Sequence, residues 1–104
     1  MTNYVIAYRG GRKFATREEG ATYMARWQAW MGDLGEAIVE PGAPLGAGKS
    51  ISASGVSDRG PDLLTGYSIV TADSLEAALE LAKKCPHLDH GTIEVAEVME
   101  MKMR

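Results

Sequence analysis

Two helix-start signals, each preceded by a strand-forming run, limit the folds that this sequence can adopt. The first is residues 16–19 (TREE), in which the Thr16 hydroxyl can accept from the Glu19 backbone N–H while the Glu19 carboxylate reaches back to Thr16. The second is residues 73–76 (DSLE). Both follow runs of β-branched and aromatic residues, so the sequence predicts two helices set between strands.

The first helix is predicted to begin near residue 17 and to end at Gly35, a residue suited to a left-handed cap. The second is predicted to stop before Pro86, because proline cannot continue a helix. Apolar residues recur every three or four positions in both, which predicts one buried stripe on each helix. The stripes are Tyr23, Trp27, Trp30, Met31 and Leu34 in the first helix and Leu75, Ala78, Leu79 and Ala82 in the second.

The remaining segments predict an antiparallel sheet. Residues 41–48 are interpreted as a loop, because their prolines and glycines disfavour helix and central strand alike. Residues 55–62 are interpreted as a turn, and Gly66 as a bulge within a strand or a site of close backbone approach. The strands are expected at residues 3–9, 36–40, 63–72 and 92–101, with a short extra edge strand within 49–54. The order β-α-β-β-α-β predicts an α+β, ferredoxin-like domain with two helices on one face of the sheet and a short extra hairpin strand between the second and third strands.

Composition narrows the kinds of protein to consider. The 104 residues suit one domain, residues 1–104. The basic residues are scattered and the net charge is −3, so no nucleic-acid partner is expected. No apolar run approaches the roughly 20 residues that cross a bilayer, and residues 1–9 lack the order of a signal peptide. Together with a single cysteine, Cys85, these features predict a cytoplasmic protein with no membrane partner.

The sheet face away from the helices is predicted to be an interface. The first and last strands carry apolar residues on both faces, so the face without helices would expose several of them. A homodimer in which two sheets stack face to face is the simplest way to cover such a surface. We therefore expect a homodimer.

Tyr23 and Trp27 lie on one face of the first predicted helix. Two interpretations stay open: an aromatic wall of a ligand pocket between this helix and the sheet, or ordinary core side chains. Core packing is the commoner role of aromatic residues at helical spacing. Trp30 is expected at the edge of the stripe or in an interface.

Glu97 interrupts an apolar face of the last strand. Strict alternation places it on the same face as Ile93, Val95 and Met99. A carboxylate among apolar side chains is typical of a general base or a ligand anchor. A β-bulge that turns Glu97 outward, or an ion pair with a partner subunit, explains the pattern equally well.

The segment after the second helix holds further candidates. His87 and His90 lack a third ligand at a recognisable spacing, so no metal site is predicted, but His87 is kept as a ligand-binding candidate. Cys85 is expected to be a buried, unreactive thiol, because the dipole at a helix C-terminus disfavours a thiolate. Residues 46–50 (GAGKS) lack the full spacing of a phosphate loop, and no cofactor is predicted.

Five short motifs follow one another along the chain: residues 58–61 (DRGP), 66–70 (GYSIV), 74–78 (SLEAA), 85–88 (CPHL) and 91–95 (GTIEV). Their order and spacing resemble the YCII-related proteins, in particular the subgroup named for a DGPF motif. The resemblance spans nearly the whole chain. It implies a dimeric α/β barrel, in which two ferredoxin-like protomers have their sheets facing one another.

The resemblance also bears on catalysis. Some YCII-related proteins carry a His–Asp pair proposed as catalytic, and the position that matches this His is Tyr23 here. No Asp follows residues 42–45 (GAPL), which resemble the stretch before the family's Asp. The resemblance therefore implies no His–Asp pair in this chain, and the catalytic residues stay unknown.

Three functional hypotheses follow. The first is a small-molecule-binding or weakly catalytic homodimer, with a pocket between the first helix and the sheet that is bordered by residues 42–50. Tyr23, Trp27, Glu97 and His87 would line this pocket. The alternative is a non-enzymatic interaction or regulatory module that acts through its dimer surface. A cofactor-independent oxygenase is a third hypothesis, which rests on fold analogy alone.

Overall fold

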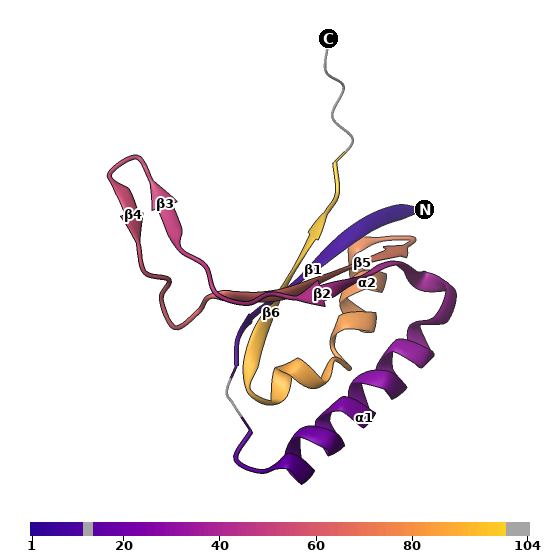
Figure 1. The fold of residues 1–104 in the computed structure, drawn as a ribbon. Helices are drawn as coiled ribbons and strands as arrows, with labels where there is room; N and C mark the ends of the chain where they lie inside the picture. The colour runs from indigo at the N-terminus through magenta and orange to yellow at the C-terminus, as the bar shows by residue number, and fades with distance from the viewer. Residues whose placement is uncertain (12–13, 100–104) are drawn as a thin grey trace.

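The computed structural model describes residues 1–11 and 14–99 (Figure 1). Four strands form one antiparallel sheet in the order β2-β5-β1-β6, and a separate two-stranded sheet pairs β3 with β4. Both helices lie on one face of the larger sheet, which confirms the predicted α+β fold. The elements are β1 (Thr2–Gly10), α1 (Arg17–Leu34), the 3-10 turn η1 (Gly35–Ala37), β2 (Ile38–Pro44), β3 (Ser50–Ser52), β4 (Gly55–Ser57), β5 (Leu64–Ala72), α2 (Leu75–Ala82), the 3-10 turn η2 (Pro86–Asp89) and β6 (Gly91–Glu97).

Both helices begin at side-chain caps. The Thr16 hydroxyl accepts from the Glu19 backbone N–H at 3.1 Å, as predicted, and α1 ends at Gly35 with a φ of 51°. The cap of α2 is Ser74, whose hydroxyl accepts from the Ala77 N–H at 3.1 Å. This helix therefore starts one residue later than a cap at Asp73 would place it.

The core lies between the two helices and the face of the sheet that they cover. Alternate residues of the central strands fill it, including Ile6 and Val70, which are fully buried. Trp30 belongs to this core: it is 4% exposed and its indole N–H donates to the Leu81 carbonyl at 3.0 Å. The expectation that Trp30 lies at the edge of the stripe was wrong, because α2 crosses above it and supplies that acceptor.

The predicted stripe of α2 is only half correct. Ala78 and Ala82 are buried, whereas Leu75 and Leu79 are 44% and 39% exposed. The helix has only eight residues, and its small alanines are the side chains that face the core. The two leucines, one turn apart, flank this contact and reach solvent.

Strand β2 corrects the predicted loop at residues 41–48, because the strand continues through Pro44. It is an edge strand, where a proline without an N–H breaks no ladder on the open side. Its pairing with β5 shifts register twice, and Gly42 sits at the second shift with a φ of +78°. Gly66 pairs with Tyr8, and the pairing of β1 with β5 shifts register directly after it, so the predicted bulge lies beside Gly66. The predicted close approach is also present, because a Cβ at Gly66 would lie 3.3 Å from the Ala43 carbonyl oxygen.

The predicted extra strand is one half of a hairpin arm, defined as residues 50–57, that stands away from the main sheet (Figure 1). The other half, β4, was predicted as turn. Ile51 and Val56 pair across the arm and are 79% and 67% exposed. At its base the Arg59 guanidinium donates to the Gly46 carbonyl at 2.9 Å and to the Leu64 carbonyl at 3.1 Å. The arm is therefore tied to the sheet at its base and has no core of its own.

The face of the sheet without helices carries half-buried apolar side chains, including Val5, Ala7 and Ile69.

Strand β6 is shorter than predicted and ends at Glu97, after which the Val98 N–H still donates to the Asn3 carbonyl at 2.9 Å. Residues 100–101, the end of the predicted strand, lie outside the described residues. Among the helices in the described ranges, none is both long enough and apolar enough to cross a membrane.

Candidate functional site

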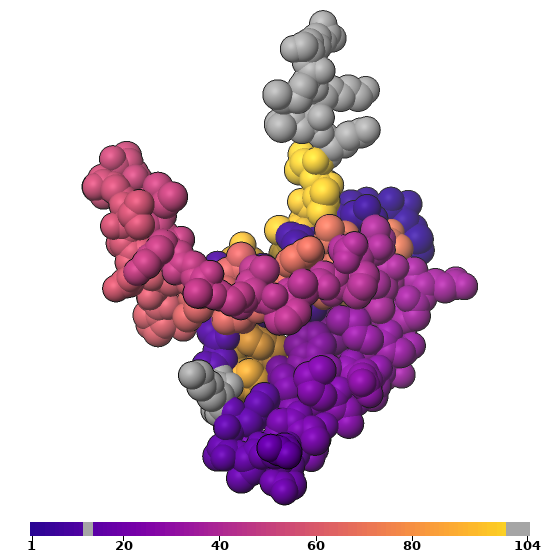
Figure 2. Space-filling view, viewed as in Figure 1, coloured from indigo at the N-terminus to yellow at the C-terminus, as the bar shows by residue number. Residues whose placement is uncertain are grey.

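A hollow of about 890 Å³ lies between α1 and the sheet, at the place where the sequence predicted a pocket. Figure 2 shows the recess between the β2 edge and the start of α1. The strands β1, β2 and β5 supply one wall, α1 the opposite wall, and His87 of η2 lies among the lining residues. This size suits a small organic molecule.

Aromatic rings form the α1 side of the hollow. The Trp27 ring meets the Tyr8 ring edge to face, with centroids 5.0 Å apart and planes at 88°. Tyr23 lies beyond it, with its centroid 6.1 Å from that of Trp27. Trp27 and Tyr23 are half-buried, unlike the enclosed Trp30, because one side of each ring faces the hollow.

A short chain of hydroxyl groups lies at the floor. The Ser68 hydroxyl donates to the Pro41 carbonyl at 2.8 Å, so its single hydrogen is used there. The Tyr8 hydroxyl, 2.7 Å from the Ser68 oxygen, must therefore be the donor to Ser68. Burial raises the pKa of Tyr8 far above its ordinary value, and the hydrogen bond with Ser68 only partly offsets this. Tyr8 thus stays protonated.

Tyr23 presents a second hydroxyl to the hollow. Burial raises the pKa of Tyr23, and a hydrogen bond from the Trp27 side chain acts in the opposite direction. A phenol hydroxyl can donate as well as accept, so Tyr23 can donate to a bound molecule.

His87 is held rigidly at the inner end of the hollow. It is 5% exposed, and its Nε2 lies 2.8 Å from the Arg9 carbonyl oxygen of β1. Its ring centroid is 5.7 Å from that of Tyr8 and 5.0 Å from that of His90. Pro86 begins the turn that carries it, and Gly91 leaves the room that its ring occupies.

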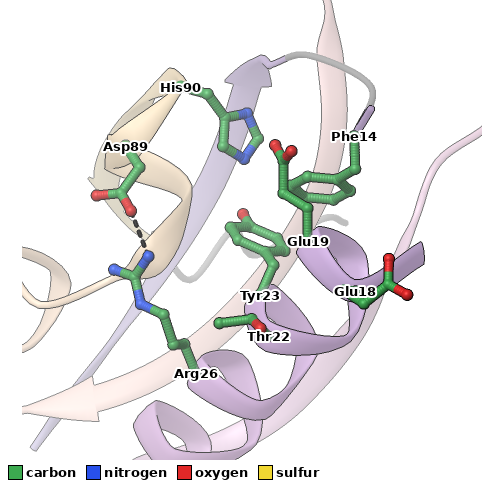
Figure 3. Close-up of a pocket in the computed structure, with 8 residues that line it drawn as sticks. All are labelled: Phe14, Glu18, Glu19, Thr22, Tyr23, Arg26, Asp89 and His90. Carbon is green, nitrogen blue, oxygen red and sulfur yellow. Dashed lines mark hydrogen bonds and ion pairs between the residues drawn. The ribbon is translucent and has the colours of Figure 1, made fainter. Parts of the chain in front are cut away.

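A smaller hollow of about 370 Å³ adjoins the first and shares Phe14, Tyr23 and His90 with it. Figure 3 shows the Tyr23 ring at its centre, with His90 beside it and an ion pair between Arg26 and Asp89 on one side. The ion pair joins α1 to η2. The two hollows therefore meet at Tyr23 and His90.

Three of the four predicted site residues line the larger hollow: Tyr23, Trp27 and His87. Glu97 does not. It pairs with Tyr4 and so shares the apolar face, as alternation predicted, but it lies at the end of β6 and its side chain is exposed. Residues 42–50 were expected to border the pocket. Of this segment only residues 42–44 line the hollow, together with the preceding Pro41, and residues 45–50 do not.

Cys85 is buried, as predicted, and burial raises the pKa of its thiol to about 11. Sequence reasoning missed Tyr8 and Ser68. Ser68 carried a usable signal, because a hydroxyl interrupts the buried face of an otherwise apolar strand. The hydrogen bond between Ser68 and Tyr8, 60 positions away, depends on the pairing of β1 with β5, so no local sequence pattern could predict it.

Comparison with known proteins agrees with this fold. A family profile for the YCII-related domain matches residues 4–102. The structure is similar to that of 5-chloro-2-hydroxyhydroquinone dehydrochlorinase from Burkholderia phenoliruptrix AC1100, solved in complex with 2,5-dihydroxybenzoquinone, with a TM-score of 0.59, 20% sequence identity and 95% of each chain covered. No protein among the curated ones matches the sequence. The extent of the profile match shows that this chain belongs to the YCII-related family.

Proposed function

We propose that this protein binds a small, flat, hydroxylated ring compound in the hollow between α1 and the sheet, as a homodimer with one such site in each copy. The observation that carries the proposal is the hollow itself, about 890 Å³ in volume and walled by the rings of Tyr8, Tyr23 and Trp27. Aromatic walls favour flat ligands through stacked and edge-to-face contacts. A protein acting only through its outer surface has no need of such a space.

The polar groups of the hollow indicate what the ring compound carries. Tyr23 offers a donor, whereas the Tyr8 oxygen and His87 offer acceptors. A hydroxyl or an enol satisfies both kinds of group at once, because it donates and accepts. The similarly folded dehydrochlorinase, named for a hydroxyhydroquinone and solved with 2,5-dihydroxybenzoquinone, supports the same ligand class.

Removal of the Trp27 ring is expected to abolish much of the binding. Titration calorimetry with 2,5-dihydroxybenzoquinone should show binding to the natural protein and at least about fivefold weaker binding to Trp27→Ala, because a stacked ring is worth about 1–3 kcal/mol. Ile51→Ala, a truncation to the same residue on the exposed arm, should bind as the natural protein does. Equal affinities for Trp27→Ala and the natural protein would contradict the proposed site.

The homodimer is proposed from the face of the sheet without helices. Val5, Ala7 and Ile69 lie half-buried there, next to one another across β1 and β5. A second copy that stacks the same face against this one covers both sets of side chains with a single two-fold contact.

Ile69→Asp is expected to convert the dimer into a monomer, because the facing sheets would bury an unpaired charge. Analytical ultracentrifugation gives the mass, and a circular dichroism spectrum shows whether the variant remains folded. Leu79→Asp, on the outer side of α2, is the matched control and should stay dimeric. A folded, dimeric Ile69→Asp protein would rule out the stacked-sheet arrangement.

A further inference from the structure

We propose that His87 is the general base of this site, and that its Nδ1 takes a proton from the hydroxyl of a phenol or enol bound in the hollow. The inference rests on the proposed function, since it needs a ligand in that place. It goes further by assigning a catalytic residue, the reacting atom and the ionised state in which the ligand is held.

The tautomer of His87 follows from its one hydrogen bond. A carbonyl oxygen only accepts, so the short contact between Nε2 and the Arg9 oxygen, 2.8 Å, places the ring hydrogen on Nε2. Nδ1 is then the basic nitrogen of the neutral ring. Within residues 1–11 and 14–99, no donor is bonded to Nδ1, and His87 is one of the residues that line the hollow.

The ring is held in this orientation from several sides. A Cβ at Gly91 would overlap Nε2 and lie 2.6 Å from the Arg9 oxygen, and a Cβ at Gly11 would lie 3.3 Å from the His87 Cε1 atom. The Tyr8 ring packs against the imidazole, with the two centroids 5.7 Å apart. Glycines at both positions are what allow the imidazole to reach β1. A ring fixed in this way presents the same nitrogen to every ligand.

Elimination among the lining residues points to the same group. The described residues around the hollow include no Asp, Glu, Lys or Arg. Of its three tyrosines, Tyr8 and Tyr23 have a pKa raised by burial and keep their protons. The third, Tyr67, alternates with the buried Gly66 and Ser68, so its side chain points to the other face of β5. His90 also lines the hollow, but its ring is turned toward Phe14 and Tyr23 at the smaller pocket. His87 is therefore the lining group left to accept the proton.

The step is a simple proton transfer. The ligand O–H bond breaks and its electron pair stays on oxygen, while a bond forms between the proton and Nδ1. The resulting imidazolium keeps its Nε2–H on the Arg9 carbonyl. An isolated charge in an apolar hollow is costly, but here the oxyanion and the imidazolium form together and pair with one another. The hydroxyl of Tyr23, which also lines the hollow, can donate to the oxyanion.

The test uses para-nitrophenol, whose phenolate absorbs visible light and whose phenol does not, at a pH below the pKa of the free probe. Bound to the natural protein, the probe is expected to be mainly phenolate. In His87→Gln, which keeps an N–H near Nε2 but has no basic atom, the phenolate share of the bound probe should fall at least about tenfold. In Ile51→Gln, on the exposed hairpin arm, the phenolate band should remain. His90→Gln is measured beside it to identify which histidine takes the proton.

Para-nitroanisole, which has no proton to give, separates binding from proton transfer and should bind the natural protein and His87→Gln alike. If neither probe binds the natural protein, the proposed function itself fails. If both bind but the phenol stays protonated, or if His87→Gln keeps the phenolate band, the ligand site stands and the role of His87 as a base is overturned. Loss of the band in His90→Gln alone would also overturn it.

Discussion

Gly42→Ala is expected to lower the free energy of unfolding by about 3 kcal/mol or more. The residue has a φ of +78°, a conformation that side chains rarely adopt, and a Cβ there would overlap the carbonyl oxygen of Tyr67 on the neighbouring strand. That oxygen belongs to the sheet backbone and cannot move without disturbing the pairing of β2 with β5. Urea unfolding followed by circular dichroism measures the loss.

Gly32→Ala is the matched control, because nothing lies within 4 Å of a Cβ built at that position of α1. It should raise the free energy of unfolding by about 0.5–1 kcal/mol, since alanine is the better helix former. The same chemical change thus has opposite signs at the two sites. A Gly42→Ala protein as stable as the natural one would show that β2 does not follow the described path.

Gly91→Ala is expected to cost about 2–3 kcal/mol and to displace His87. The new methyl group would take the space of the imidazole Nε2 and lie 2.6 Å from the Arg9 oxygen, which β1 holds in place. The hydrogen bond between Nε2 and that oxygen cannot survive. The protein should remain folded at room temperature, because a domain of this size is typically stable by about 5–15 kcal/mol, and para-nitrophenol bound to it should lose its phenolate band.

A double-mutant cycle tells whether the imidazole is what Gly91 accommodates. In a His87→Ala background, where the ring is absent, Gly91→Ala should cost at least about 1 kcal/mol less than in the natural protein. Gly46→Ala, at a position with nothing within 4 Å of a Cβ, should stay within about 0.5 kcal/mol in either background. If Gly91→Ala lowers the free energy of unfolding equally in both backgrounds, the loss comes from the contact with the Arg9 backbone oxygen and not from the imidazole.

Local signals predicted most of the architecture. The cap at Thr16, the stop at Pro86 and the alternation along β1 and β5 depend on neighbours within a few residues, so they can be found in the sequence directly. The full length of β2 could not be predicted in this way, because Pro41 and Pro44 are compatible with a strand only when that strand is at a sheet edge. Edge position is a property of the assembled sheet.

The residues of the site could be predicted only in part, because local spacing shows which side chains share a face but not what packs against them. Helical spacing placed Tyr23 and Trp27 on one face of α1, but the burial of Trp30 in the core depends on where α2 crosses. Alternation assigned Glu97 to the correct face of β6, yet burial at a strand end depends on what lies above it. The orientation of His87 required the carbonyl of Arg9, 78 positions away.

The hairpin arm has a consequence for variation and for engineering. The lining of the large hollow uses Pro41–Pro44 and then Leu63 and Thr65–Ser68, and it takes nothing from residues 45–62. The length of this segment can therefore change without altering the ligand site, and each doubling of a flexible loop costs only about 0.6 kcal/mol. A peptide tag or fluorescent reporter inserted between Ser52 and Gly55, at the tip of the arm, would leave the hollow intact.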